Sequence, residues 1–292
     1  MIGTTADEGN LFVFLSFLLH KPDEDIYKGL IQKAFGRFSE SNPGVVDAIF
    51  EHYSLANQRY GNVNKLINLN IDLNSAPFHP FYALGDIISD VSFTCPSQQL
   101  LKAAHLFSTN KHPNGQKNVY GYLWSYNHDP KDVMRAYHGC ELPYFFGGGD
   151  RTQPDSVALG KQVFSYLLQF IRTGSPALPN QPEWPAFGDE HNVLVFQPNV
   201  TVATHFKDEI CQWWHKNFPK GMPMTTDDLL ADEPLVSMVF NKYILFVLVA
   251  FNRRPRLAYS VSGVLLLIIG LVAYKVFQFI CCCRRKKPIA TK

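Results

Sequence analysis

The residues of this sequence best suited to chemistry lie around His138. Residues 136–147 are AYHGCELPYFFG, so a glycine follows the histidine directly. Glycine permits a sharp backbone turn, which would hold the imidazole out from the chain. His138 is one of ten histidines, and a single histidine is usually a packed core residue or a surface residue. An imidazole becomes a general base when a carboxylate accepts a hydrogen bond from one ring nitrogen and leaves the other facing a nucleophile.

Four segments of the sequence resemble one protein family. HGCELPYFFG, at 138–147, closely resembles HG-x-E-L-x-Y-x-FG, the motif around the catalytic histidine of the type B carboxylesterases, the cholinesterase-like branch of the α/β-hydrolase fold. GTTADEG, at 3–9, resembles the family segment G-x-x-x-D-E-G, whose glutamate is the acid of a Ser-His-Glu triad. DVSFTCP at 90–96 and EICQWW at 209–214 resemble two segments that the family often joins by a disulfide. All four stand in the family's order, so the resemblance covers residues 3–218.

The resemblance implies a role for each residue that matches. His138 would be the general base and Glu8 the acid that orients it. Each carboxylate also has another interpretation. Glu8 could simply begin a helix and interact with the positive end of the helix dipole. Glu141 could be mistaken for the acid, but it is too close in sequence to His138 to reach the ring easily and is better suited to bonding within its loop. The implied reaction needs no metal and no cofactor.

Three cysteines precede the apolar C-terminal region. The resemblance implies a disulfide between Cys95 and Cys211, which would connect the helix after Cys95-Pro96 to the last helix of the domain. Disulfides persist in oxidising compartments, so such a pair agrees with a lumenal or extracellular location. Cys140 matches no cysteine of the family and is expected to be a free thiol.

The sequence lacks the family's nucleophile motif. In α/β-hydrolases the serine stands in G-x-S-x-G and precedes the acid and the histidine, but no G-x-S-x-G occurs in the 292 residues. Ser175, at a helix end, and Ser262, in an apolar run, do not fit such a turn. Because Glu8 already holds the second place in the triad order, the nucleophile is expected before Met1. We therefore expect the C-terminal portion of an α/β-hydrolase fold with an incomplete sheet, from a truncated gene product or a partial gene model.

The elements that must position these residues follow from the apolar patterns. Residues 3–9 suggest the end of a strand and a turn, with an apolar, helix-like run after them. Beyond these the pattern alternates between helix and strand. It predicts helices around 98–108, 157–173 and 207–217 and strands at 119–126 and 193–196. Alternating strands and helices predict an α/β fold.

One long apolar segment lies near the C-terminus. Residues 257–280, LAYSVSGVLLLIIGLVAYKVFQFI, contain one charge, Lys275, whose stem could reach the lipid headgroups. At about 1.5 Å per residue, such a helix spans a hydrocarbon core of roughly 30 Å with some tilt. We predict a single transmembrane helix here, the alternative being a buried core helix. The apolar run at 235–251 is interrupted by Asn241 and Lys242 and is predicted to be a membrane-proximal helix rather than a second span.

The residues that flank this segment indicate its orientation. Basic residues stand on both sides of it, so their counts nearly balance. Cys281, Cys282 and Cys283 stand next to RRKK and suit cytoplasmic S-palmitoylation, the alternative being inert thiols. With the tail in the cytoplasm, residues 1–256 are expected to be lumenal or extracellular. The sequon at Asn199 would then be open to N-glycosylation.

Four regions are therefore expected. They are the C-terminal part of a type B carboxylesterase domain at 1–220, a membrane-proximal linker with an apolar helix at 221–256, the transmembrane helix at 257–280 and a basic, cysteine-rich cytoplasmic tail at 281–292. Twenty-seven basic residues against 25 acidic ones leave no excess of positive charge. That balance argues against a nucleic-acid partner.

The function that the resemblance implies is hydrolysis of small-molecule carboxylic esters by an enzyme anchored in the lipid bilayer. This chain lacks the nucleophile, so we expect it to be inactive alone. The alternative is a non-catalytic, neuroligin-like cell-surface adhesion protein, because such proteins share the fold and a single C-terminal span. Choline esters are less favoured than other carboxylic esters, since Asn10 and Leu11 stand before Phe12 and residues 130–137 contain no tryptophan. The sequence indicates no particular protein partner.

Overall fold

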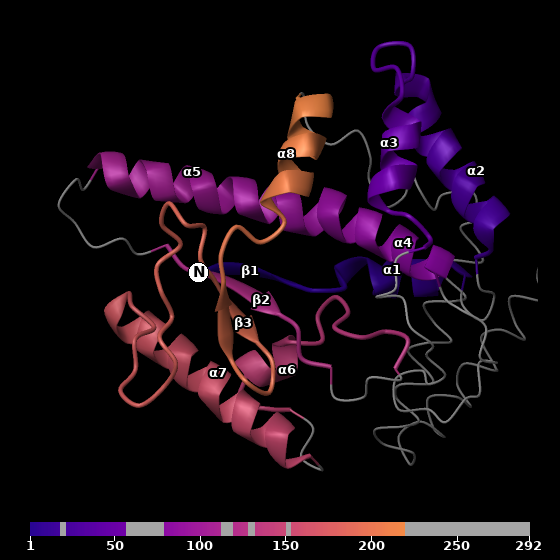
Figure 1. The fold of residues 1–292 in the computed structure, drawn as a ribbon. Coiled ribbons are helices and arrows are strands. Elements are labelled where there is room, and N and C mark those ends of the chain that lie inside the picture. Colours follow the sequence, from indigo (N-terminus) through magenta and orange to yellow (C-terminus); the bar gives the residue numbers. More distant parts are fainter. Residues whose placement is uncertain (18–21, 57–78, 112–118, 128–131, 150–152, 220–292) are drawn as a thin grey trace, which may run out of the picture. The chain divides into compact units, whose positions relative to one another are not determined.

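A computed structural model describes residues 1–17, 22–56, 79–111, 119–127, 132–149 and 153–219 (Figure 1). By its internal contacts the chain divides into two units, 1–233 and 234–292, and all the described residues belong to the first unit. The predicted linker, transmembrane helix and basic tail, at 221–292, lie outside the described residues. Among the described helices, none is both long and apolar enough to cross a bilayer.

Four strands form one mixed sheet in the described part of the chain. In spatial order they are β1 (Ile2–Thr5), β2 (Gly121–Trp124), β3 (Val193–Phe196) and β4 (Thr201–Ala203). The first three are parallel, and β4 returns antiparallel to β3. Parallel neighbours need long crossover connections, which is why helices separate these strands in the sequence. A mixed sheet with intervening helices confirms the α/β class.

Helices make up most of the connections. They are α1 (Glu8–Phe17), α2 (Glu24–Phe35), the 3₁₀ turn η1 (Gly36–Phe38), α3 (Val45–His52), α4 (His79–Ile88), the π-helix η2 (Ser89–Thr94), α5 (Cys95–Lys111), α6 (Leu142–Phe145), α7 (Pro154–Thr173) and α8 (Asp208–Asn217). The helix predicted around 98–108 is α5, and it begins earlier because η2 continues into it without a break. Pro96, the second residue of α5, has no backbone N–H to donate to the preceding helical turn.

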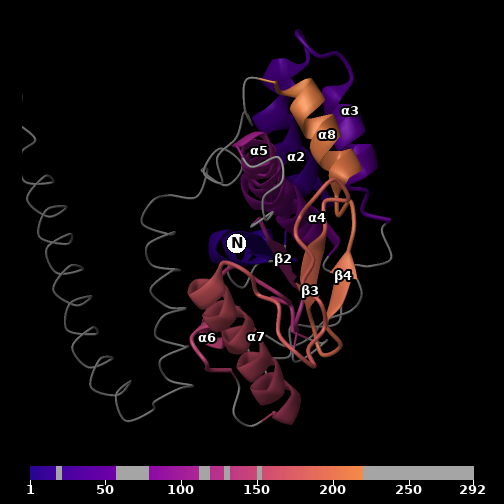
Figure 2. The ribbon, with the colours of Figure 1, turned by 90° about the vertical axis from the view of Figure 1, so that its left-hand side faces the viewer.

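The sheet has a helix layer on each face, with α5 on one side and α7 on the other (Figure 1, Figure 2). Successive strand residues point to opposite faces, so each layer contacts its own set of side chains. One core cluster joins α5 to the sheet through Leu101, Leu123, Val193 and Val195. The other joins α7 to the sheet through Leu159, Val163, Tyr166, Trp124, Leu194 and Phe196. β2 and β3 contact both helix layers, which explains why their residues are mostly apolar and form short apolar runs in the sequence.

The first helix packs against α4 at unusually short range. A Cβ atom on Gly9 would lie 2.0 Å from the carbonyl oxygen of Gly85, so no larger residue fits there without movement of the helices. Ser89 bridges the two helices, since its hydroxyl donates to the Gly85 carbonyl at 2.7 Å and accepts from the Gly9 N–H at 2.9 Å. Packing therefore explains Gly9, the second glycine of the GTTADEG segment. The same packing holds the start of α1 in place.

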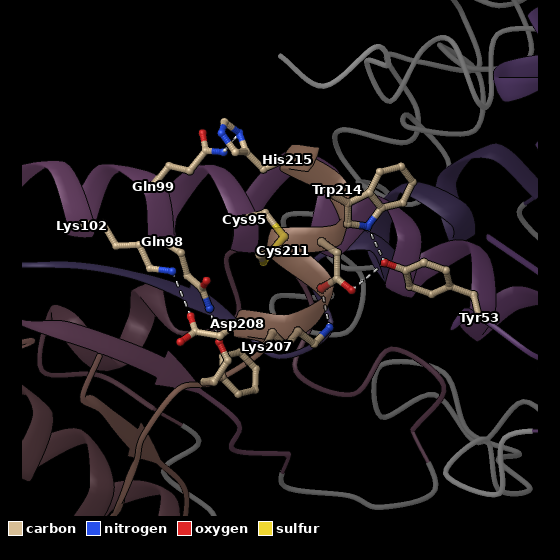
Figure 3. The surroundings of a disulfide bond; sticks show 12 residues. Tyr53, Cys95, Gln98, Gln99, Lys102, Lys207, Asp208, Cys211, Trp214 and His215 are labelled. Carbon is tan, nitrogen blue, oxygen red and sulfur yellow. Dashed lines mark hydrogen bonds and ion pairs between the residues drawn. A yellow bond between two sulfur atoms is a disulfide. The ribbon is translucent and has the colours of Figure 1, made fainter. Parts of the chain in front are cut away.

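A disulfide joins Cys95, the first residue of α5, to Cys211 of α8, with an S–S distance of 2.05 Å and a Cα–Cα distance of 5.1 Å (Figure 3). This is the pairing that the resemblance implied. Cys140 is a free thiol. The bond attaches the last described helix to the helix layer that covers one face of the sheet.

Candidate active site

Glu8 is placed by the transition from β1 to α1. The strand ends at Thr5, two residues turn, and Glu8 is the first residue of the helix. Its side chain is buried, with 4% of the residue exposed. One carboxylate oxygen, Oε1, accepts a hydrogen bond from the Thr5 N–H at 2.6 Å. That bond folds the side chain back over the strand end and leaves the second oxygen for another partner.

The second oxygen of Glu8 meets His138. His138 Nδ1 lies 2.6 Å from Glu8 Oε2, although the two residues are 130 positions apart in the sequence. They meet because β1 and β2 are parallel neighbours, with Thr5 beside Trp124 at the same end of the sheet. The segments that follow these two strands therefore leave from the same edge. The acid and base implied by the resemblance are thus brought together.

Backbone hydrogen bonds attach the histidine loop to the start of α1. The Ala6 N–H donates to the Trp124 carbonyl at 2.8 Å, and the Asp7 N–H donates to the Ala136 carbonyl at 3.0 Å. The Asp7 side chain completes the connection by accepting from the Ala136 N–H at 3.4 Å. Two residues before His138, the loop is therefore fixed to the residue next to Glu8.

Side chains of α1 and α4 hold an earlier part of the same loop. Asn10 donates its side-chain N–H to the Met134 carbonyl at 3.3 Å, and Tyr82 donates its hydroxyl to the Val133 carbonyl at 3.1 Å. The guanidinium of Arg135 lies 3.8 Å from the centre of the Tyr82 ring, a cation–π contact. The loop is therefore anchored from two helices, which limits how far His138 can move away from Glu8.

The turn after His138 uses a left-handed backbone. Gly139 has φ +81°, a region that residues with a Cβ rarely adopt. The Cys140 N–H closes the turn by donating to the Tyr137 carbonyl at 3.1 Å. This agrees with the expectation that a glycine next to the histidine allows a sharp loop.

The environment of His138 is partly aromatic. Its side chain is 46% exposed, and the ring centres of Phe12 and Phe93 lie 5.4 Å and 5.0 Å from the imidazole. The hydrogen bond to Glu8 is the main cause that raises the pKa of His138, while burial opposes the rise and the Glu8 charge adds to it. With Nδ1 donating to Glu8, the neutral imidazole has a free lone pair on Nε2, as a general base requires.

Glu141 does not take the place of Glu8. Its Oε2 atom is buried and has no hydrogen-bond partner among the described residues, whereas the imidazole of His138 bonds to Glu8. Burial is the main cause that raises the pKa of Glu141, and the nearby Glu8 adds to the rise. Of the two carboxylates near the imidazole, Glu8 is the one in position to orient it.

The Glu8–His138 pair leads to a pH-dependent prediction. Because the pKa of folded His138 is raised, the pair stabilises the fold fully below the unfolded pKa of about 6.5, and this contribution is lost as pH rises through the folded pKa. We expect an NMR titration to show that Glu8→Gln lowers the pKa of His138 toward 6.5, since it removes the carboxylate charge. Glu141→Gln is the matched control and should lower it less. Equal shifts in the two variants would contradict the assignment.

The remaining predicted site residues are not part of this pair. Asn199 is exposed in the turn between β3 and β4, and its glycosylation stays a prediction. Cys281, Cys282 and Cys283 lie outside the described residues. Sequence reasoning did not assign a role to Asp7, although it stands in the GTTADEG segment.

A separate group of possible metal ligands, His191, His205 and Asp208, also escaped the sequence analysis. No motif spacing in the sequence identifies it, because turns on either side of the β3–β4 pair bring its members together.

The comparisons with known proteins agree with this geometry. The family model described as "Carboxylesterase family" matches residues 1–214. The chain is 25% identical over 169 residues to carboxylesterase 5A of the dog, which covers 52% of the chain and 28% of that protein. It is 28% identical over 147 residues to human cocaine esterase, with coverages of 46% and 24%, and 27% identical over 140 residues to pig liver carboxylesterase, with coverages of 44% and 23%.

The matched region spans about a quarter of the length of these relatives. The family match nevertheless extends over most of the chain and includes both Glu8 and His138. The chain therefore belongs to the carboxylesterase family and to its α/β-hydrolase fold.

Proposed function

We propose that this chain is the C-terminal part of a membrane-anchored hydrolase of carboxylic esters, in which Glu8 and His138 are the acid and the base of a Ser-His-Glu triad. The observation that carries the proposal is the 2.6 Å hydrogen bond from His138 Nδ1 to a buried carboxylate oxygen of Glu8. An orienting carboxylate on one ring nitrogen, with the other nitrogen free, is the arrangement that a serine hydrolase needs.

In the proposed reaction, His138 first accepts a proton from the nucleophile and then donates it to the leaving group. As the serine oxygen bonds to the ester carbonyl carbon, Nε2 takes the hydroxyl proton. Nε2 then donates that proton to the alcohol as its bond to the carbonyl carbon breaks. Water then attacks the carbonyl carbon of the acyl-enzyme while Nε2 takes a water proton, and Nε2 returns that proton to the serine oxygen as the serine–acyl bond breaks and the acid is released. Glu8 orients the ring and stabilises the imidazolium that forms after each proton uptake.

The nucleophile is proposed to come from residues outside this sequence. No G-x-S-x-G occurs in the 292 residues, and the relatives extend well beyond the matched region. Within the described sheet, β1 is an edge strand. Edge strands present unpaired backbone groups, so β1 has room for a further strand beside it. The serine and the oxyanion hole would then belong to the part of the enzyme that carries those strands.

The substrate and the membrane attachment are further parts of the proposal. Phe12 and Phe93 beside His138 favour an ester with an apolar group near the reacting carbon. The apolar run at 257–280 supports a single C-terminal span, and Cys281–Cys283 with the basic residues after them support a cytoplasmic tail. The catalytic region would then be lumenal or extracellular, which agrees with the disulfide.

A fluorophosphonate probe for active serines tests the proposal. We expect the probe to label the complete enzyme, encoded by the transcript that includes upstream exons, and to leave the purified 292-residue chain unlabelled. An in-frame stop before the codon for Met1, with no exon encoding G-x-S-x-G nearby, would contradict the proposal. So would ester turnover by the purified chain that His138→Ala abolishes, because the nucleophile would then lie inside these residues.

The apolar run at 257–280 also supports a second candidate, a non-catalytic adhesion protein of the neuroligin type with a single C-terminal span. The two candidates differ at one position. A serine in the upstream turn would identify a hydrolase, whereas any other residue there would favour adhesion.

A further inference from the structure

Three side chains with metal-binding atoms meet on the β4 side of the sheet, away from the Glu8–His138 pair. His191 lies in the turn before β3, His205 in the turn after β4, and Asp208 is the first residue of α8. One ligand atom of each lies within 4.8 Å of the others. Both Nδ1 atoms point at the same carboxylate oxygen, Asp208 Oδ2, at 2.6 Å from His191 and 2.9 Å from His205.

The surrounding residues orient each of the three groups. The His191 ring stacks on Phe187, a residue that is 1% exposed, with ring centres 5.0 Å apart and planes 17° apart. His205 Nε2 lies 3.4 Å from Glu190 Oε2. The other oxygen of Asp208, Oδ1, accepts from Lys102 Nζ at 3.1 Å (Figure 3). Both Nδ1 atoms therefore face Asp208 Oδ2, and the other polar atoms of His205 and Asp208 are held by Glu190 and Lys102.

We propose that His191, His205 and Asp208 bind a divalent transition-metal ion, with Zn²⁺ the best match. Two imidazole nitrogens and one carboxylate oxygen are a usual zinc donor set, with water in the fourth position. The contact of His205 Nε2 with Glu190 matches the carboxylate–histidine–metal arrangement, in which a second carboxylate holds the ring of a ligand. The site is independent of the ester hydrolysis proposed above.

Metal binding would change the separations of the three ligand atoms by up to about 1.5 Å. Zinc–ligand bonds of about 2.0–2.1 Å place tetrahedral ligand atoms about 3.3 Å apart. The hydrogen-bonded pairs at 2.6 Å and 2.9 Å would open by less than an ångström, and the widest separation, up to 4.8 Å, would shorten. Each Nδ1 proton must leave or move to Nε2, because only a neutral nitrogen with a free lone pair binds a metal. The half-exposed His205 gives an ion access from solvent.

A bound ion would fasten α8 to the sheet. The three ligands come from the turn before β3, the turn after β4 and the start of α8, and Cys211 stands three residues after Asp208 in the same helix. The disulfide attaches α8 to α5, whereas the metal would attach it to the two strand ends. We therefore assign the ion a structural role.

The test is zinc binding by the complete 292-residue chain in which Cys281, Cys282 and Cys283 are replaced by Ser. Their thiolates would otherwise bind zinc more strongly than the proposed site. After removal of metal with a chelator, we expect calorimetric titration to give one equivalent of Zn²⁺. Co²⁺ in place of Zn²⁺ should give the intense visible absorption of a tetrahedral site. At zinc concentrations 100-fold above Kd, the unfolding temperature should rise by about 5 to 10 °C.

Three variants locate the ion. We expect His191→Ala to weaken zinc binding more than about 100-fold, and Glu190→Gln, which leaves all three ligands in place, to weaken it about tenfold. His215→Ala is the matched control, because His215 lies on α8 and contacts Gln99 rather than the proposed ligands. Unchanged binding in both His191→Ala and Glu190→Gln would overturn the proposal. Absence of zinc binding by the parent chain would also overturn it and leave the three groups as a hydrogen-bonded network.

Discussion

In an enzyme that joins this chain to its nucleophile, His138→Ala is expected to lower kcat by about 10⁴ to 10⁶-fold. Without the base, neither the serine in acylation nor the water in deacylation loses its proton as it attacks, so both halves of the reaction slow together. KM should change little, because the imidazole acts mainly on the transition state. The measurement is steady-state hydrolysis of a p-nitrophenyl ester by the purified enzyme.

Two carboxylate variants test whether the hydrogen bond from the imidazole to Glu8 matters for catalysis, or only the presence of a carboxylate near the ring. Glu8→Gln keeps the shape of the side chain but removes the charge that fixes the Nδ1 proton, and should lower kcat by about 10⁴-fold. Glu141→Gln is the matched control. Its carboxylate has no hydrogen bond to the ring, so its effect should stay below about tenfold. A loss as large for Glu141→Gln as for Glu8→Gln would show that the acid has been misassigned.

Removal of the Cys95–Cys211 disulfide is expected to cause the largest loss of stability. The bond closes a loop with a sequence separation of 116 residues, for which the chain-entropy relation gives roughly 4 to 5 kcal/mol. We expect the Cys95→Ala/Cys211→Ala double variant to lose stability in that range. Urea unfolding followed by circular dichroism, with the remaining thiols alkylated, measures the change.

Other contacts of α8 limit what the variant should change. Trp214 donates its indole N–H to the Tyr53 hydroxyl at 2.8 Å, and Tyr53 donates to Asp90 of η2 at 2.9 Å (Figure 3). Lys207 pairs with the same carboxylate at 2.5 Å. These contacts remain in the double variant, so α8 should stay helical while its amides exchange faster. Cys140→Ala, which removes a thiol outside any disulfide, is the control. A double variant no less stable than this control would contradict the prediction.

Much of the fold could be predicted from residue patterns. The strand at 193–196 and the helices at 157–173 and 207–217 were all predicted, because buried strands are continuous apolar runs and a helix stops at a residue such as Gly174, with φ +75°. The strand around 122 was predicted too long. Of the predicted residues 119–126, only 121–124 pair with β1 and β3. Local sequence does not show where the hydrogen bonds between neighbouring strands end.

Order along the sheet was not predictable from local sequence. β1 and β2 are separated by more than a hundred residues, yet they are neighbours. Strand pairing depends on which faces the helices cover, and that is a property of the whole fold. The close approach of Gly9 to Gly85 is of the same kind, because either glycine alone would pass for a flexible position.

The sequence by itself determined the family, the likeness of Glu8 and His138 to an acid and a base, and the lack of a nucleophile motif. It did so because motifs record residue types and their order. Tertiary structure showed the 2.6 Å contact between Glu8 and the imidazole, and it alone decided that His191, His205 and Asp208 converge. The physical reason is that parallel strands bring their carboxyl ends to one edge of a sheet, and turns flanking the β3–β4 pair bring side chains from distant positions to one point.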